Sequence, residues 1–363
     1  MSLTSFNINN FRNFYQTELN FHDKCNVFYG KNGSGKTSLL EAIYYLVLGR
    51  SFRSHLLRRI VKYGTDGFSL FGRIQQENNL VAIGITRSIE SGKQIKIAGK
   101  IVTSNIEITK LSPLQLLNYN SYLLLYEGSK IRRQYIDWGL FHVEQSFLDL
   151  WRRVERVLEQ RNIALRAKLS PDCIRIWDKD LAQLGLELHN YRKRYVEDLI
   201  PIAQEILQKL LCDFSVNISY SAGWDTNLDL STVLTNNLKN DLQLGYTTAG
   251  PQRADLQISI EKVPAKDALS RGQQKLLLYG LQIAQGILLN KLTGKKCIYL
   301  IDDLLAELDL QKCKLLANVL LNLSKAQIFI TGLTHENLEN IFVDSKSDRK
   351  AFHLDNGNVS SLK

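Results

Sequence analysis

Eight residues near the start of the chain have the spacing of a phosphate-binding loop. The pattern G-x-x-x-x-G-K-[ST] is matched by Gly30-Lys31-Asn32-Gly33-Ser34-Gly35-Lys36-Thr37, which follows an apolar run ending at Tyr29. Glycines permit a tight turn whose backbone N–H groups face phosphates, and a helix starting there adds partial positive charge. We expect Lys36 to contact the β and γ phosphates of ATP and Thr37 to ligate Mg²⁺. The alternative is a simple glycine-rich turn.

A pair of carboxylates ends an apolar run far along the chain, where Cys297 to Ile301 precedes Asp302 and Asp303. We expect Asp302 to ligate Mg²⁺ and Asp303 to polarise the attacking water, so that both residues and Lys36 are catalytic. Because Asp is shorter than Glu, the base lies farther from the water, and a weak, slow ATPase is expected. The alternative is a pair of surface acids that pair with lysines.

A third motif stands 27 residues before Asp302 (302 − 275), in Leu269-Ser270-Arg271-Gly272-Gln273-Gln274-Lys275. Ser270 can cap a helix, and Gly272 lets another backbone approach closely. We expect neither residue to have a use within its own subunit. Ser270, Gly272 and Gln273 are therefore predicted to contact the γ-phosphate of ATP bound by a second copy, which makes a homodimer. The alternative is an ordinary capped helix, and the role of Arg271 stays open.

The elements around these motifs alternate between strands and helices. Three strands are expected before the phosphate loop and three after a helix from Lys36 to about Leu48. Strands are also expected at 216–220, 256–260, 297–301 and 327–330, with helices at 270–290 and 310–323. The pattern predicts an α/β fold in which the nucleotide-binding segments come from both ends of the chain.

The middle of the chain has a helical pattern with a seven-residue repeat. Phe147, Trp151, Val154, Leu158 and Leu165 follow it, with Arg161 in one apolar slot. A second apolar repeat follows the turn at Pro171. We expect an inserted antiparallel helical hairpin, with the chain divided into 1–128, 129–213 and 214–363.

Composition narrows the classes of partner and compartment. Lys and Arg exceed Asp and Glu by 46 − 36 = 10, and the isoelectric point is near 9.2, which favours a polyanionic partner such as nucleic acid over a merely basic surface. Five separated cysteines indicate neither disulfides nor zinc. We expect a cytoplasmic chain without a signal peptide or a membrane span.

Two sets of basic residues are candidates for contacts with DNA phosphates. The first set follows the phosphate-loop helix and comprises Arg53, Arg58, Arg59 and Lys62. The second lies on the hairpin and comprises Arg152, Arg153, Arg156, Arg192, Lys193 and Arg194. The alternative for each set is a solvated helix face.

These motifs together resemble the RecF family of ABC-type ATPases of DNA maintenance, nearly from end to end. The resemblance also rests on Asn10–Phe14, Leu40–Tyr45, Gly49–Arg53, Arg132–Trp138, Gly250–Asp255 and Glu307-Leu308-Asp309. It implies an ABC-type P-loop ATPase head with ATP and Mg²⁺, sandwiched as a homodimer on double-stranded or gapped DNA. It also implies DNA damage repair, replication, recombination and the SOS response, with RecO and RecR as partners in loading RecA.

The same resemblance assigns further residues. Arg12 would lie near the nucleotide, Gln115 would occupy the Q-loop region with a catalytic role, and Glu307-Leu308-Asp309 would meet the opposite subunit. Gln252 stands where the family often has His, and the γ-phosphate switch residue is either Thr331 or His335. The alternatives are a chromosome-structuring ATPase like SMC or Rad50, the ATPase subunit of a membrane transporter, and a small-molecule kinase. The short hairpin, the basic charge and the Ser270 motif weigh against these respectively.

Overall fold

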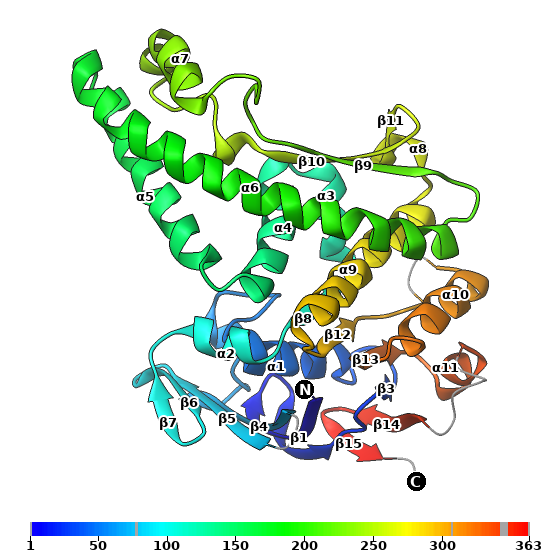
Figure 1. The fold of residues 1–363 in the computed structure, drawn as a ribbon. Helices are drawn as coiled ribbons and strands as arrows, with labels where there is room; N and C mark the ends of the chain where they lie inside the picture. The colour runs from blue at the N-terminus through cyan, green and yellow to red at the C-terminus, as the bar shows by residue number, and fades with distance from the viewer. Residues whose placement is uncertain (1, 77–78, 306–307, 342–347, 362–363) are drawn as a thin grey trace. The chain divides into compact units, whose positions relative to one another are not determined.

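The chain folds into two compact units, shown in a computed structural model that describes residues 2–76, 79–305, 308–341 and 348–361 (Figure 1). The first unit comprises Met1–Ser121 and Thr293–Lys363, so both ends of the chain build it. The second comprises Tyr122–Leu292. The segment 129–213, expected as the inserted hairpin, lies in the second unit together with the strands and the helix that follow it. The two units therefore have other bounds than the three expected segments.

A six-stranded, largely parallel sheet forms one layer of the first unit. Its order is β15 (Asn358–Ser361), β14 (Arg349–Asp355), β3 (Cys25–Tyr29), β13 (Ala326–Gly332), β12 (Cys297–Ile301) and β8 (Leu114–Leu117). Only the β14–β15 pair is antiparallel. The residues of β12 and β13 are all buried, as the continuous apolar runs predict for a parallel sheet covered on both faces.

An antiparallel sheet forms a second layer of the same unit. Its order is β2 (Phe14–Asn20), β1 (Ser2–Phe11), β4 (Gly67–Gln76), β5 (Asn79–Ser88), β6 (Gly92–Ile97) and β7 (Lys100–Val102). Buried residues alternate with more exposed ones along β4, which is typical of a sheet with one face on the core. The strands expected before and after the phosphate loop are confirmed.

Helix α1 (Lys36–Leu48) contacts both sheets and has the bounds expected from the sequence. It touches β1, β4 and β5 of one sheet and β13 of the other (Figure 1). Its apolar residues from Leu39 to Val47 are almost all fully buried in one cluster. Burial of a Leu or Ile contributes about 1.5–3 kcal/mol, so this helix fixes the loop that precedes it firmly. Helices α2 (Asn105–Leu111), α10 (Leu310–Leu321) and α11 (His335–Ile341) complete the unit.

The second unit contains the helical hairpin, drawn in green in Figure 1. Helix α4 (Ser129–Val143) leads into α5 (Phe147–Arg166) and the 40-residue α6 (Pro171–Leu210). Ser146 lies 2.8 Å from Tyr191, and Arg161 lies 2.7 Å from Asp178. Residues later in α5 therefore contact residues earlier in α6, so the hairpin is antiparallel, as expected.

Arg161 interrupts the apolar repeat of α5 because it is a buried ion-pair residue. Its side chain is fully buried and donates to Asp178 at 2.7 Å, Asp241 at 2.7 Å and Thr247 at 2.8 Å. Asp241 belongs to α7 (Leu230–Leu244), so this one side chain joins α5, α6 and α7. A buried cation needs such partners, since its desolvation is costly.

A three-stranded antiparallel sheet completes the second unit, in the order β11 (Val263–Pro264), β10 (Asp255–Ile260) and β9 (Val216–Ser221). The short helices α3 (Leu123–Tyr126) and α8 (Ala265–Ala268) lie in the same unit. Helix α9 (Arg271–Thr293) carries the Ser270 motif at its start, and its residues 274–289 are nearly all buried. The expected strands and this helix are confirmed within a few residues.

Candidate nucleotide-binding site

Three neighbouring strands of the parallel sheet bring the phosphate loop and the acidic motif together. β3 ends at the phosphate loop, β12 ends before Asp302, and β13 lies between them and contains Thr331 near its end. Because parallel strands end at the same edge, residues some 270 positions apart in the sequence meet there. Thr37 Oγ1 donates to Asp302 Oδ1 at 3.0 Å, which confirms the proximity of the two expected metal ligands.

A pocket of about 850 Å³ opens at this edge. From the phosphate loop and α1 it is lined by Asn32, Gly33, Gly35, Lys36, Thr37 and Ser38, and from the other strand ends by Asp302, Asp303 and Thr331. The remaining lining residues are Arg12, Asn13, Arg53, Arg59, Val61, Lys62 and Tyr63. The volume of the pocket and its cationic lining suit a nucleoside triphosphate.

The phosphate loop has the backbone that its glycines permit. Gly33 has a φ of +81° and Gly35 a φ of +112°, and a Cβ atom on Gly35 would lie 2.5 Å from the Asn13 side chain. Any larger residue at position 35 would therefore be both strained and crowded. Asn13 also donates to Ser34 O at 3.2 Å, which joins the β1–β2 turn to the loop.

The Lys36 ammonium donates to two carbonyls of its own loop, Gly30 O at 2.5 Å and Lys31 O at 3.0 Å. Burial lowers the Lys36 pKa, and the nearby carboxylates of Asp303 and Asp302 oppose that effect. The cation is thus partly desolvated and placed beside the pocket, which strengthens its attraction to a phosphate.

The oxygen set around Asp302 fits a divalent cation. Burial raises the Asp302 pKa, opposed by hydrogen bonds from Thr37 and Thr331, the latter 3.0 Å long. Hydroxyl and carboxylate oxygens are the ligands that Mg²⁺ prefers, and a cation would compensate the desolvated carboxylate. Thr37 and Asp302 are the residues that would hold Mg²⁺ and so neutralise phosphate charge.

Asp303 and Thr331 form one hydrogen-bonded unit. Asp303 has a φ of +51°, and its backbone N–H donates to Thr331 Oγ1 at 2.7 Å. An Asp in this left-handed conformation is uncommon, and the hydrogen bond to Thr331 helps to hold it. The backbone of Asp303 in turn determines where its carboxylate lies in the pocket. Of the two switch candidates, Thr331 lines the pocket and contacts Asp302, whereas His335 contacts the Tyr29 ring at 5.1 Å and Glu339 at 3.5 Å.

Arg12 lines the pocket while its guanidinium forms a two-pronged ion pair with Glu41 of α1. The two bonds measure 2.9 and 2.7 Å, and the Glu41 side chain is fully buried. Arg53 lies 3.5 Å from the same carboxylate, and Ser51 donates to it. Arg12 thus joins β1 to α1 at the rim of the nucleotide pocket, close to where the resemblance expects it.

Two further expectations concern Gln115 and the Glu307-Leu308-Asp309 segment. Gln115 lies inside β8, is buried opposite Tyr299 of β12, and is not among the described residues that line the pocket. Glu307 lies outside the described residues. Asp309 caps α10 by accepting from Lys312 N at 2.9 Å.

The four basic residues considered for DNA divide into two groups. Arg53, Arg59 and Lys62 line the phosphate-loop pocket, and Lys62 donates to Asn13 O at 3.2 Å. Arg58 is exposed, and the pocket lining does not include it. The four residues are close together in the sequence and were therefore treated as one set. In the folded chain, three of them line the nucleotide pocket and Arg58 does not.

On the hairpin, a phosphate-contacting role for Arg192 is wrong. This residue is buried, forms two bonds of 2.8 Å with Asp137, and donates to Pro251 O at 2.7 Å. Arg152 and Arg156 are exposed and line a surface hollow with Trp151. Gln252 donates to Thr247 O and Ala249 O, at 3.3 and 3.0 Å, as a neutral amide.

The signature segment, Leu269 to Lys275, forms a helix cap within its own chain. Ser270 Oγ accepts from Gln273 N at 3.4 Å, and Gln273 Oε1 accepts from Ser270 N at 2.9 Å. This reciprocal pair is a capping box. The expectation that Ser270 has no use in its own subunit is therefore wrong, because it starts α9. Ser270 is nevertheless exposed.

Comparison with known proteins places this architecture. The family model described as the RecF/RecN/SMC N-terminal domain matches residues 2–352. The DNA replication and repair protein RecF of Psychromonas ingrahamii is 42% identical over 361 residues, which cover 99% of each chain. The chain belongs to the RecF family. Its RecF relative from Coxiella burnetii strain Dugway 5J108-111 is 40% identical over 358 residues, again 99% of each.

A solved structure of the recombination mediator protein RecF with ATP, in the RecFOR pathway, has the same fold. It is 26% identical, with a TM-score of 0.83, and the match covers 100% of this chain and 98% of that one. The expected ABC-type P-loop head is confirmed. This match over the full length favours a RecF-type ATPase over the SMC-like and transporter alternatives. Among the described residues, no helix is long and apolar enough to cross a membrane.

Sequence reasoning missed the side chains that support this RecF-type site. Glu41 and Asn13 contribute a buried carboxylate and an amide that join β1, the phosphate loop and α1. Both lie within motifs that carry the resemblance, but nothing in their spacing indicates a partner. Tyr122 and Tyr126, which donate hydrogen bonds to Arg271 O and Gln274 Oε1 at the start of α9, were also missed, since aromatic residues in an apolar run suggest only core packing.

Proposed function

We propose that the chain is an ATP-dependent DNA-binding protein of recombinational repair. ATP and Mg²⁺ occupy the pocket of the phosphate loop, and a homodimer forms when the signature segment of one copy meets the ATP of another. The dimer binds duplex or gapped DNA, hydrolyses ATP slowly, and helps RecO and RecR to load RecA in the cytoplasm.

The exposed Ser270 is the observation that carries this proposal. It stands at the start of α9 in the second compact unit, whereas the phosphate loop, Asp302 and Thr331 belong to the first. An exposed hydroxyl and a small Gly272 suit a phosphate supplied by another molecule. The solved RecF structure with ATP supports the same ligand.

The steps of hydrolysis follow from the residues of the pocket. Lys36 neutralises phosphate charge, and Thr37 with Asp302 would hold Mg²⁺. Asp303 orients the attacking water, and Thr331 Oγ1 fixes Asp303 by accepting a hydrogen bond from the Asp303 backbone N–H. In the proposed dimer, Ser270 and Gln273 of the second copy complete the site.

The net charge of +10 supports a nucleic-acid partner. We assign the contact with DNA phosphates to Arg58 first, since it is exposed and the pocket lining does not include it. Arg53, Arg59 and Lys62 serve DNA or the nucleotide, and affinity measurements separate these roles. Phosphate contacts predict that affinity falls steeply with salt.

Fluorescence anisotropy with a labelled gapped duplex tests this function. With ATP, wild type binds tightly at low salt, and Lys36→Ala loses the ATP-dependent part of the affinity. Arg58→Ala lowers the slope of log affinity against log salt by about one, because one phosphate contact is lost. DNA affinity that ignores both ATP and salt would refute the proposal.

A further inference from the structure

Arg271 lies over two aromatic rings of its own chain. Its guanidinium carbon is 5.5 Å from the centre of the Tyr122 ring and 5.1 Å from that of Tyr126. Both distances are within the ~6 Å range of cation–π attraction. Tyr122 directly precedes the four-residue helix α3, and Tyr126 is its last residue, so Arg271, whose role the sequence leaves open, has an aromatic partner surface.

The tyrosine hydroxyls bind the first turn of α9. Tyr122 donates to Arg271 O at 3.0 Å, and Tyr126 donates to Gln274 Oε1 at 3.1 Å. Gln274 is buried and donates in turn to Lys266 O at 2.8 Å and Leu269 O at 2.9 Å. The backbone on both sides of Ser270 is therefore attached to α3 through side chains.

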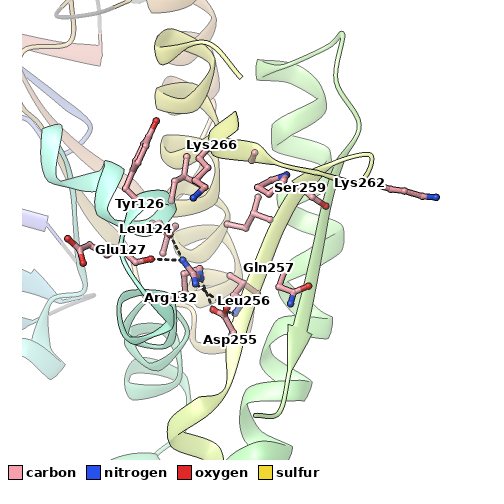
Figure 2. A pocket seen from close by; sticks show the side chains of 14 residues that line it. Leu124, Tyr126, Glu127, Arg132, Asp255, Leu256, Gln257, Ser259, Lys262 and Lys266 are labelled. Atoms are coloured by element: carbon pink, nitrogen blue, oxygen red, sulfur yellow. Dashed lines mark hydrogen bonds and ion pairs between the residues drawn. The ribbon is translucent and has the colours of Figure 1, made fainter. Parts of the chain in front are cut away.

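Helix α3 is itself held by the Arg132 guanidinium, shown in Figure 2. Arg132 of α4 donates to Glu127 O at 2.7 Å and to Leu124 O at 3.4 Å, carbonyls at the end of α3. The same guanidinium binds Asp255 of β10 at 2.6 and 3.0 Å. A helix of four residues is unstable alone, so these bonds account for its order.

We propose that Tyr122 and Tyr126 are positioning residues for the signature segment. They fix Arg271 and Gln274, and thereby the direction of Ser270, before a second copy of the chain arrives with its ATP. This inference rests on the proposed function, because it assumes that Ser270 meets ATP in a dimer. Ordering a segment during association costs free energy, so a signature segment that is already ordered in the monomer favours the dimer.

Sedimentation equilibrium with a slowly hydrolysed ATP analogue tests the inference in the full chain. We compare wild type with Tyr126→Phe, which keeps the ring, and Tyr126→Leu, which removes ring and hydroxyl. Ser270→Arg is the reference that blocks the signature segment, and Tyr15→Leu, at an exposed tyrosine of β2, is the matched control.

The dimer dissociation constant should rise in a fixed order. Each lost hydrogen bond weakens association about two- to tenfold, and a symmetric dimer loses two, so Tyr126→Phe should raise the constant roughly tenfold. Tyr126→Leu should raise it further, and Arg271→Lys should be milder than Arg271→Gln because it keeps a cation over the rings. Nucleotide affinity of the monomer should match wild type, and Tyr126→Phe should melt only slightly below wild type, since one hydrogen bond is lost.

The outcomes separate the two ideas. If Ser270→Arg dimerises like wild type, the proposed dimer is wrong and the inference fails with it. If Ser270→Arg is monomeric while both Tyr126 variants dimerise like wild type, the positioning inference alone is overturned. If Tyr126→Leu is poorly folded, Tyr126→Phe and the two Arg271 variants decide, and wild-type constants in all three would overturn it.

Discussion

Replacing Thr331 by Val removes one hydroxyl and almost no volume from the centre of the nucleotide pocket. Thr331 is fully buried, and its Oγ1 accepts from Asp303 N at 2.7 Å while it donates to Asp302 Oδ1 at 3.0 Å. A buried donor left without its partner costs about 1–3 kcal/mol, and a hydrogen bond to a carboxylate contributes about 1.5–3 kcal/mol. We expect a loss of stability of about 2–4 kcal/mol, since the pocket's water recovers part of the sum.

ATP turnover should fall more than ATP affinity in Thr331→Val. Asp303 loses the bond that supports its left-handed backbone, so the proposed orientation of the attacking water by its carboxylate should be lost, and a shift of this kind costs on the order of 100-fold in rate. The phosphate loop keeps its own bonds, so nucleotide affinity should change less than about threefold by the same reasoning. Phosphate release at saturating ATP and titration with a fluorescent nucleotide measure the two quantities. Thr331→Ser keeps the hydroxyl and is the control, and wild-type turnover in Thr331→Val would refute the reasoning.

Three further predictions concern single side chains. Lys36→Ala should abolish ATP binding in a calorimetric titration, because the partly desolvated ammonium beside the loop is lost, and unchanged affinity would contradict the assignment. Nucleotide-free Asp302→Asn should melt at a higher temperature than wild type at pH 7, because burial raises the pKa of this carboxyl and its charge therefore opposes folding. In scanning calorimetry this difference should shrink as the pH falls through the raised pKa and vanish well below 3.8, where the carboxyl is protonated in both states; a constant difference would show another cause. Arg161→Leu should lower the free energy of unfolding in urea by about 3–5 kcal/mol, because Asp178 and Asp241 stay buried without their cation, and Arg153→Leu, at an exposed position of the same helix, should change little.

Much of the fold and of the phosphate site could be predicted because the signals are local. The bounds of α1 follow from the phosphate-loop pattern and the apolar residues behind it, and β12 and β13 are continuous apolar runs. The proximity of Thr37 and Asp302 also follows, since parallel strands end at one edge. These inferences need only periodicity and motif spacing.

The partners of polar side chains could not be predicted, because they depend on distant segments. Arg161 interrupts an apolar repeat in the sequence, but its carboxylates lie in α6 and α7. Arg192 sits in a basic run that suggests DNA contacts, yet it pairs with Asp137 and is buried. Arg271 likewise has its aromatic surface about 150 positions earlier in the sequence. Burial and pairing of this kind arise only when the whole unit has folded.

If ATP joins two copies of the chain through Ser270, light scattering coupled to gel filtration will detect the dimer. Wild type and Ser270→Arg are compared without nucleotide, with ADP and with ATP and Mg²⁺, beside Ser231→Arg, which adds the same charge at an exposed serine of α7. Wild type and Ser231→Arg should be dimers only with ATP and Mg²⁺, and Ser270→Arg should be a monomer that still binds ATP. A monomer of wild type under every condition, or a dimer of Ser270→Arg with ATP, would contradict this prediction.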